Sequence, residues 1–438
     1  MKNSHSLFVV PLLGVAALNL SGCGPDPVDP QKQIGANPYL PEIHQYLIPP
    51  MHVANVVRWN DGEKPKVADG LKIEALATDL KNPRSLYVLP NGDILIIEAD
   101  GPKAPINRPK EFIMGWIEKK SHSSTKAGNR ILLIRPAVDG RPAQRTVFID
   151  HLNSPFGVVL VDNDLYVANT DAIMRFHYQP GQTEITEPGV KLTDLPAGPI
   201  NHHWTKSLTA NADGSKLYAG VGSNSNITEN GIGAEMDRAA IWEIDRVSGA
   251  HRLFATGLRN PNGLQFEPKT QTLWAVINER DELGPDLVPD YLTSVKDGAF
   301  YGWPYSYYGQ HVDPRVQPQR PDLVAKAIPP DYALSSHVAP LGLVFYNGAN
   351  LPQNYRGGAF IGEHGSWNRQ VFNGYKIVYV PFAEGHPSGM AQDVVTGFLA
   401  GGDDVHGRPV GLAVDKQGGL LIADDVGNTV WRVTSQDK

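Results

Sequence analysis

The loop at residues 198–206 holds the densest group of side chains that could take part in chemistry. It places two adjacent histidines, His202 and His203, beside Trp204 and Lys206. An imidazole can act as a general base near neutral pH, an indole can form a flat apolar wall, and a lysine supplies a cation. Surface loops also carry such residues without any catalytic role, so this pattern needs support from the rest of the chain.

Two further loops carry groups that suit an anionic ligand and a hard cation. Arg259 and Asn260 stand just before a turn, where the guanidinium could neutralise a carboxylate or stabilise negative charge that develops on oxygen. A salt bridge that caps the turn is the simpler alternative for Arg259. Asp281 and Glu282 lie in the loop 278–286, whose carboxylates and backbone carbonyls suit Ca²⁺, although acidic loops are often only solvated.

Cationic side chains recur in two loops nearer the C-terminus. The segment 362–369 brings His364, Trp367 and Arg369 to the end of an apolar run, and Arg408 precedes another such run. Several arginines, a lysine, flat aromatic rings and a histidine base fit a ligand that is anionic, rich in oxygen and planar. A polycarboxylate quinone has these properties, whereas the glycine-rich motifs of nicotinamide and nucleotide sites do not occur in the sequence.

These loops belong to short β-rich units that repeat along the chain. Each unit has an apolar segment, most often with a glycine, then a turn and an apolar strand with a polar end, and no amphipathic helical pattern separates the units. The units predict an all-β, six-bladed β-propeller whose long loops lie on one face, with a strand at 70–76 closing the ring against 429–433. The candidate residues would then meet at one end of the central channel. The six units span 83–98, 155–169, 205–222, 260–276, 340–362 and 409–425.

The composition of the chain limits the classes of function. Its 438 residues include 39 Lys+Arg against 46 Asp+Glu, a net charge of −7, which argues against binding driven by nucleic-acid phosphates. The single cysteine, Cys23, excludes an internal disulfide, a cysteine-rich zinc site and an attached c-type haem. A redox reaction in this chain would therefore pass its electrons to an external carrier.

The position of Cys23 predicts a lipid anchor. Residues 1–22 have the pattern of a secretory signal, with a short basic start and a run of 14 mostly apolar residues that is too short to span a bilayer. Small residues before Cys23 resemble the bacterial lipobox, and Gly24 after it favours a periplasm-facing anchor in the outer membrane of a Gram-negative bacterium. An ordinary signal peptide with an incidental cysteine is the alternative. Residues 23–68 are rich in proline and are expected to form a tether that partly wraps the propeller domain at 69–438.

Six blocks of the sequence resemble the sorbosone dehydrogenase family, and the likeness runs from about residue 70 to 435. That family stands with the soluble glucose and aldose dehydrogenases that use pyrroloquinoline quinone (PQQ). The resemblance implies a six-bladed propeller with PQQ and Ca²⁺ bound at the top of its channel. The blocks lie at 201–204, 257–261, 278–284, 301–305, 363–369 and 407–411.

The resemblance also implies a role for each candidate residue. His203 matches the family's catalytic base, and His202 stands where the glucose enzymes have an aspartate that helps to orient the base. Arg259 matches the arginine over the quinone oxygens, with a catalytic role, and Asn260 matches the neighbouring cofactor contact. The other candidates for cofactor binding are His202, Lys206, His364, Arg369 and Arg408, and the candidates for metal binding are Asp281 and Glu282.

The sequence therefore predicts PQQ-dependent oxidation of an aldose or a sugar aldehyde. His203 would take the hydroxyl proton of a hemiacetal or hydrated aldehyde, while the hydride passes to the quinone and Arg259 stabilises the charge on its oxygen. The electrons would leave to a cytochrome or a quinone. A calcium-dependent propeller hydrolase of the lactonase type and a non-catalytic, envelope-anchored binding propeller are the alternatives. The loops 101–129 and 305–337 are expected to choose the sugar.

Overall fold

The computed structural model describes residues 28–46, 50–102, 128–137 and 143–437, and the chain is built almost wholly of β-strands. Within these residues the helical elements are short, and none of them is long and apolar enough to cross a membrane. The signal sequence, Cys23 and most of the loop 101–129 lie outside the described residues. The helical elements are η1 (Pro30–Gln33), η2 (Ile232–Glu235), α2 (Pro321–Val324) and η3 (Gln353–Tyr355).

Three four-stranded antiparallel sheets follow one another in the first half of the chain. Each is a simple meander in which every strand pairs with the next strand in the sequence. The first sheet contains β5 (Pro83–Val88), β6 (Ile94–Glu98), β7 (Arg130–Arg135) and β8 (Gln144–Ile149). The second contains β9 (Gly157–Val161), β10 (Asp164–Ala168), β11 (Ala172–His177) and β12 (Val190–Asp194). The third contains β13 (Leu208–Ala210), β14 (Lys216–Val221), β15 (Ala240–Asp245) and β16 (His251–Thr256).

Three further sheets take in strands from the N-terminal part of the chain. The fourth sheet contains β17 (Pro261–Phe266), β18 (Leu273–Ile277), β19 (Pro289–Ser294), β22 (Tyr332–Ser336) and β1 (Ile34–Gly35). The fifth contains β23 (Pro340–Phe345), β24 (Ala359–Glu363), β25 (Lys376–Val380), β28 (Gln392–Thr396) and β3 (Lys66–Val67). The sixth contains β31 (Pro409–Val414), β32 (Leu420–Asp424), β33 (Thr429–Ser435) and β4 (Leu71–Ala77).

Small sheets and hairpins lie outside these six sheets. The only parallel pairing among the named strands joins β2 to β30, which brings the N-terminal part of the described chain against the loop that precedes β31. The strands concerned are β2 (Asn55–Val56), β29 (Leu399–Gly401), β30 (Asp404–Val405), β20 (Ser306–Tyr307), β21 (His311–Val312), β26 (Phe382–Ala383) and β27 (His386–Pro387).

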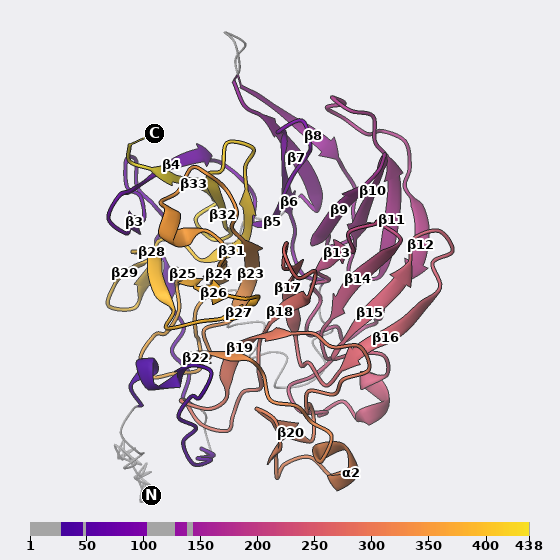
Figure 1. The fold of residues 1–438 in the computed structure, drawn as a ribbon, viewed down its shortest axis with the longest axis vertical. Coiled ribbons are helices and arrows are strands. Elements are labelled where there is room, and N and C mark those ends of the chain that lie inside the picture. The colour runs from indigo at the N-terminus through magenta and orange to yellow at the C-terminus, as the bar shows by residue number, and fades with distance from the viewer. Residues whose placement is uncertain (1–27, 47–49, 103–127, 138–142, 438) are drawn as a thin grey trace, which may run out of the picture.

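The first strands of the six sheets form a closed ring. Each of β5, β9, β13, β17, β23 and β31 contacts the first strand of the following sheet, and β31 contacts β5. The sheets radiate from this ring, as Figure 1 shows, and their buried faces pack against one another. This arrangement is a β-propeller, so the predicted all-β class and propeller architecture are confirmed.

Glycines in the first strands let neighbouring sheets approach closely at the centre of the ring. A Cβ atom on Gly411 of β31 would lie 2.7 Å from the Cα atom of Ser85 in β5. A Cβ atom on Gly342 of β23 would clash with the carbonyl oxygen of Val410 in β31. No side chain fits at such distances. The glycines that recur in the sequence units therefore mark places where one sheet meets the next.

The ring closes through strands from the two ends of the described chain. In the sixth sheet, β4 pairs antiparallel with β33, with Ile73 opposite Val433 and Glu74 opposite Arg432. This pairing confirms the closure that the sequence predicts between 70–76 and 429–433. The residues before β4, expected to be a tether, pack along the fourth and fifth sheets, where β1 and β3 become edge strands.

Candidate functional site

The candidate residues gather at one end of the ring because of the antiparallel register within each sheet. Pro340 at the start of β23 lies opposite Glu363 at the end of β24, and Pro409 at the start of β31 lies opposite Asp424 at the end of β32. A residue just before the first strand therefore lies beside a residue just after the second strand. The residues at or near these positions include Arg84, which is the second residue of β5, and His203, Ser223, Arg259, Asn260, Asn278, His337, His364, Arg408 and Asp425.

The His203 ring is fixed through Nδ1 by a backbone carbonyl, which leaves its other nitrogen, Nε2, for a different partner. Its Nδ1 lies 2.9 Å from the carbonyl oxygen of Ser223, which can only accept, so Nδ1 carries the proton. The Ser223 hydroxyl, 3.0 Å from the same nitrogen, donates its own hydrogen to the carbonyl oxygen of Ser225. The lone pair of the neutral ring is then on Nε2, for which no hydrogen-bond partner occurs among the described residues.

The surroundings of His203 keep this ring neutral. Burial lowers the pKa of His203 well below the usual value of 6.5, and the nearby positive charge of Arg259 lowers it further. The exposed His202 lies beside it, with the ring centroids 4.8 Å apart, and also lowers the pKa of His203. A histidine in this state is ready to accept a proton over the whole neutral range.

Arg259 is buried and rigidly fixed beside His203. Its guanidinium donates to the carbonyl oxygen of Glu279 at 2.7 Å, to the Asn226 side chain at 3.0 Å and to the Asp281 carboxylate at 3.1 Å. Asp281 in turn accepts a hydrogen bond of 2.6 Å from Asn368. The arginine therefore supplies a fixed positive charge, and Asp281 joins loops of the third, fourth and fifth sheets.

Asn260 presents a buried polar atom without a partner. Its side-chain oxygen is buried and accepts no hydrogen bond from the described residues, although the residue is only 6% exposed. The oxygen packs close to Gly222, where an added Cβ would lie 2.6 Å from it and would also clash with His203. An unpaired buried acceptor is costly, so this position favours a ligand that donates a hydrogen bond.

A second group of charges stands on the side of the ring formed by the first, fifth and sixth sheets. Arg84 and His364 both donate to the same carboxylate oxygen of Asp425, His364 at 2.9 Å. Burial lowers the pKa of His364 to about 4. Arg408 donates to the Tyr375 hydroxyl at 2.9 Å. The Nε atoms of Arg84 and Arg408 are buried and have no partner among the described residues, so both arginines keep a donor for an anion.

Trp204 lies between these two groups. It follows His203 in the chain, and the guanidinium carbon of Arg84 is 5.7 Å from the centroid of its ring. The ring also contacts Phe156 edge to face at a centroid distance of 6.4 Å. The predicted flat wall is therefore present, and its indole is bracketed by the catalytic candidate and by a cation.

Two of the predicted cofactor-binding cations, Lys206 and Arg369, contact other groups of the protein. Lys206 is fully buried, and its ammonium donates to the Trp204 carbonyl oxygen at 3.1 Å. Burial lowers the pKa of Lys206 to about 7. Its hydrogen bond to the Trp204 carbonyl supports the loop 198–206 from the interior of the protein. Arg369 donates to Asp286 at 2.6 Å and to the Ser336 hydroxyl at 2.5 Å. Its charge is thus directed toward Asp286, between the fourth and fifth sheets.

Asp281 and Glu282 do not fit a calcium site as they stand. Both carboxylate oxygens of Asp281 accept from nitrogen donors, and its carbonyl oxygen accepts from Asn226 and Arg315. Glu282 is exposed. Across the described residues no group of three or more His, Cys, Asp or Glu is placed to hold a metal ion. No step of the chemistry is therefore assigned to a metal, and the two ligands stay a prediction.

The sequence did not point to several residues of this site. Arg84 stands one residue inside β5, near the same strand start as Arg408 in the sixth sheet, so the repeat could have revealed it. His337 precedes β23 and lies 3.2 Å from Asn368 and 3.2 Å from the Gly284 carbonyl oxygen. Asp425 follows β32, and only its ion pair with Arg84 and its hydrogen bond with His364 identify it.

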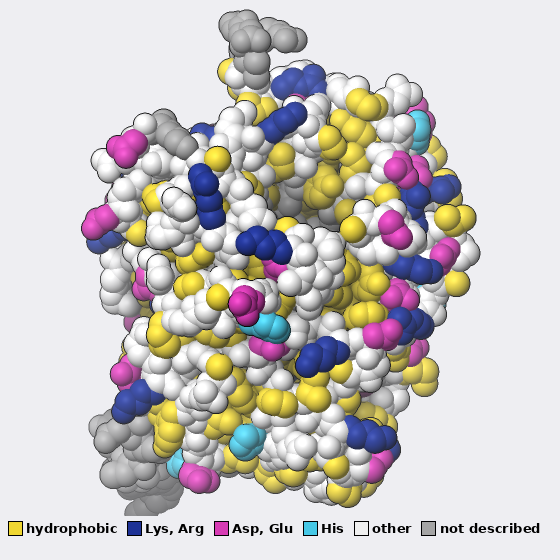
Figure 2. All heavy atoms as spheres, viewed as in Figure 1, with side chains coloured by type: hydrophobic (Ala, Val, Ile, Leu, Met, Phe, Trp, Pro, Cys, Tyr) yellow, Lys and Arg dark blue, Asp and Glu magenta, His cyan; other side chains and the backbone are white. Residues whose placement is uncertain are grey.

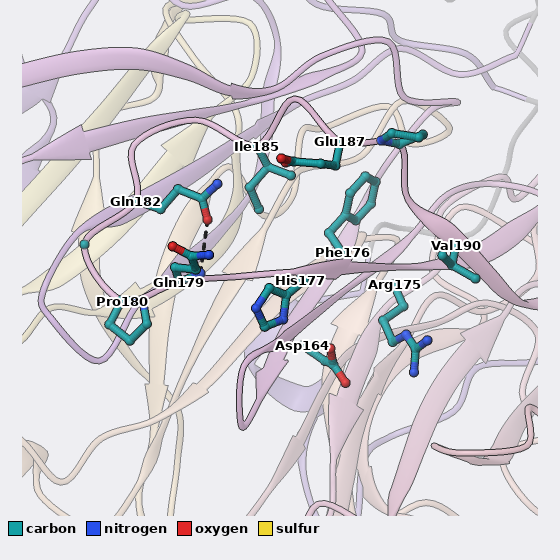
Figure 3. A pocket seen from close by; sticks show the side chains of 12 residues that line it. Asp164, Arg175, Phe176, His177, Gln179, Pro180, Gln182, Ile185, Glu187 and Val190 are labelled. Carbon is teal, nitrogen blue, oxygen red and sulfur yellow. Dashed lines mark hydrogen bonds between the residues drawn. The ribbon is translucent and has the colours of Figure 1, made fainter.

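A large surface depression lies elsewhere and contains none of these residues. It is formed by β10, β11 and the loop before β12, and Figure 3 shows Arg175, His177 and Glu187 around it with Gln179 hydrogen-bonded to Gln182.

Figure 2 shows acidic and basic side chains interspersed over the face in view. That distribution agrees with the absence of a basic run in the sequence.

Two family models match the chain. The glucose/sorbosone dehydrogenase model covers residues 80–368, and the TrAA12-like model covers residues 316–436. An uncharacterized protein of Borreliella burgdorferi is 29% identical over 294 residues, which are 64% of this chain and 76% of that protein. An aldose sugar dehydrogenase of Escherichia coli (strain K12) is 29% identical over 108 residues, which are 24% of this chain and 28% of that protein.

Solved structures share the fold at low sequence identity. The holo PQQ domain of a pyranose dehydrogenase from Coprinopsis cinerea has a TM-score of 0.69 at 19% identity, over 87% of this chain and 100% of that one. The PQQ-bound aldose sugar dehydrogenase of Streptomyces coelicolor has a TM-score of 0.53 at 16% identity, over 85% and 99%. These likenesses establish the common propeller fold.

Proposed function

The chain belongs to the glucose/sorbosone dehydrogenase family, and from that premise we propose that it oxidises an aldose or a sugar aldehyde with PQQ as its cofactor. The observation that carries the proposal is the state of His203. Its Nδ1–H is fixed on the Ser223 carbonyl, its Nε2 lone pair has no described partner, and its pKa is held low by burial and by Arg259. A general base needs a fixed ring and an available lone pair, and the low pKa keeps this ring unprotonated at neutral pH.

The residues around His203 fit PQQ, a planar quinone with three carboxylates. Asn260 has a buried oxygen, and Arg84 and Arg408 each have a buried N–H, for which the described part of the chain supplies no partner. Trp204 supplies a flat face beside them. The arginines would hold carboxylates, and Asn260 with Arg259 would hold the polar edge of the ring system. When it is bound, PQQ supplies a two-electron acceptor for a hydride.

The protein's own part in the reaction is to bind the sugar, to orient the His203 ring and to remove one proton. His203 would accept the proton of the anomeric hydroxyl, or of a hydrated aldehyde, at Nε2. Ser223 fixes the tautomer and the direction of the ring through Nδ1. Arg259 favours the neutral ring before the reaction, because a second positive charge nearby would be unfavourable.

We also propose how the sheets form the propeller, where the protein is located and which partner takes its electrons. We take each of the six sheets as one blade of a six-bladed propeller. Residues 1–22 would be removed and Cys23 acylated, which would hold the enzyme on the periplasmic side of a bacterial outer membrane. With one cysteine and no haem attachment motif, the chain would pass its electrons to an external cytochrome or quinone.

One experiment tests the proposal against its rivals. Purified protein is mixed with PQQ, with and without Ca²⁺, and the absorption spectrum and the glucose-dependent reduction of a dye are recorded. We expect a bound-cofactor spectrum and dye reduction, and the two series show whether the metal is required. A hydrolase of the lactonase type would release acid without reducing the dye. A protein that binds no PQQ under either condition would overturn the proposal.

A further inference from the structure

Gln33 joins the N-terminal segment to two loops of the site. It ends η1 and is fully buried, although its neighbours Gln31 and Lys32 are exposed. Its side-chain N–H donates to the Asp286 carbonyl oxygen at 2.5 Å, and its side-chain oxygen accepts from the Ser336 hydroxyl at 2.9 Å. A glutamine that uses both ends of its amide in this way holds the two loops together.

The two partners of Gln33 are also the partners of Arg369. The guanidinium of Arg369 donates to the Asp286 carboxylate at 2.6 Å and to the Ser336 hydroxyl at 2.5 Å. Since the serine hydroxyl donates its own hydrogen to Gln33, the hydrogen bonds run in one direction from Arg369 through Ser336 to Gln33. The position of this buried arginine therefore depends on the N-terminal segment.

Further contacts fix the same segment in place. The backbone N–H of Val28 donates to the second carboxylate oxygen of Asp286 at 3.1 Å. Two residues before Ser336, Leu334 of β22 pairs with Ile34 of β1. His44 donates its backbone N–H to the Leu283 carbonyl oxygen at 2.9 Å, in the loop that follows Asp281. The segment thus follows the loop 281–288 along much of its length.

A second stretch of the N-terminal part makes a comparable contact with the sixth sheet. The indole of Trp59 donates to one carboxylate oxygen of Asp424 at 2.7 Å. The other carboxylate oxygen of Asp424 accepts from the backbone N–H of Arg408 at 2.8 Å. Trp59 therefore orders the carboxylate that fixes the backbone of Arg408.

We infer that residues 28–46 and 50–68 support the binding site rather than forming a passive tether, with Gln33 as a positioning residue for Arg369 and Trp59 for Arg408. This inference rests on the proposed function, because Arg408 is a cation that would hold a PQQ carboxylate, and the loop that Gln33 and Arg369 fix at Asp286 also carries Asp281, the partner of Arg259. An arginine whose partners are loosened must be ordered when the ligand binds, and that ordering lowers affinity. Loss of the Gln33 amide should therefore raise the dissociation constant of PQQ while the protein stays folded.

The test compares Gln33→Leu with Gln31→Leu, a matched change of the same residue type on the same short helix. PQQ is titrated into each purified, cofactor-free protein, and the dissociation constant is read from quenching of tryptophan fluorescence. We expect Gln33→Leu to bind PQQ about tenfold more weakly and Gln31→Leu to bind it as the wild type does. Equal affinities in all three proteins would overturn the inference.

A second series separates this inference from the proposed function and from simple misfolding. Ser336→Ala removes the same link from the propeller side, and its effect on PQQ affinity should not add to that of Gln33→Leu in the double variant. In the cofactor-free proteins, amide hydrogen exchange at 281–288 and 366–373 should be faster in Gln33→Leu than in Gln31→Leu. If the wild type bound no PQQ, the proposed function would fail, and unchanged exchange rates would still refute the positioning role.

Discussion

At the scale of single residues, the site shows how chemical character comes from partners in other sheets. His203 precedes the third sheet, yet its tautomer is set by Ser223 after β14 and its low pKa by burial and by Arg259 before β17. His364 illustrates the same rule with a different outcome. Its ring donates to Asp425, so it serves as a neutral hydrogen-bond donor to the carboxylate that pairs with Arg84. Two histidines at comparable strand ends thus have different roles.

Replacement of His203 tests the assignment of the base. His203→Ala should lose about 10² to 10⁴ in turnover of the PQQ-loaded protein, because no other described side chain takes the place of its Nε2. PQQ binding should persist, since the arginines and Asn260 are unchanged. Dye-reduction rates at saturating sugar measure the loss. His177→Ala, on the outer surface of the second sheet, is the control, and near-normal turnover of His203→Ala would refute the role.

The pH profile tests the cause of the low pKa. A base must be neutral to act, and the pKa of His203 lies well below 6.5, so kcat/KM should stay level from pH 8 down past 6.5 and fall only in more acidic solution. Arg259→Met removes the positive charge that lowers this pKa, and the acid limb should move to higher pH. Arg259→Lys keeps the charge and should keep the limb near its original place. A profile that is the same in both variants would contradict the electrostatic explanation.

At the scale of elements, the close approach of the first strands decides where the sheets can meet. Gly342 of β23 lies against the carbonyl oxygen of Val410, and Gly411 of β31 lies against the backbone of β5. Because these contacts involve backbone atoms, neighbouring strands cannot yield as a flexible side chain would. The same contacts set the positions of the loops that carry His337, Arg408 and Arg84, so packing at the centre and geometry of the site are linked.

A methyl group at this contact should therefore be destabilising. Gly342→Ala is expected to lower the free energy of unfolding by about 1 to 3 kcal/mol, because β23 and β31 must move apart. Gly233→Ala in η2, where an added Cβ has no neighbour within 4 Å, should change stability little. Denaturant unfolding of both proteins measures the difference. Equal stabilities would mean that the ring centre is less tightly packed than these contacts indicate.

At the scale of the whole molecule, the two ends of the described chain complete the ring together. β4 and β33 join the N-terminal and C-terminal parts in one sheet, and residues 28–46 and 50–68 contact the fourth, fifth and sixth sheets before β4 begins. If the chain is attached to a membrane at Cys23, few residues would separate the anchor from the first contact with the propeller. The first described contact, from Val28 to Asp286, is already at the site.

The proposed anchor can be tested directly. Cys23→Ala should abolish labelling with a fatty-acid analogue and move the protein from the membrane fraction to the soluble fraction, because acyl chains on this cysteine would supply the attachment. Fractionation followed by immunodetection measures the distribution, and Cys23→Ser is a second variant with the same expectation. A Cys23→Ala protein that still sediments with membranes would contradict the lipoprotein assignment.

The sequence alone predicted the six repeating units and their order, but not the short strands β1, β2 and β3. Alternating apolar strands, turn residues and recurrent glycines identified the repeating units, and the apolar runs at 70–76 and 429–433 flank these units at the two ends of the predicted ring. The loop residues His203, Arg259, Asn260 and Arg408 were recognisable too, since their loops stand at equivalent places in successive units. These features are local, and local sequence controls backbone conformation.

Only the tertiary structure decided which side chains meet. Arg84 and Asp425 are 341 positions apart and Gln33 and Asp286 are 253 apart, yet each pair is in direct contact. Closure of the ring brings the first pair together and packing of the N-terminal segment on the fourth sheet brings the second pair together, and no spacing in the chain encodes either contact. The same closure buried Lys206 beneath its loop and directed Arg369 to Asp286. Strand and turn patterns depend on neighbours in sequence, whereas charge pairing, burial and pKa depend on neighbours in space.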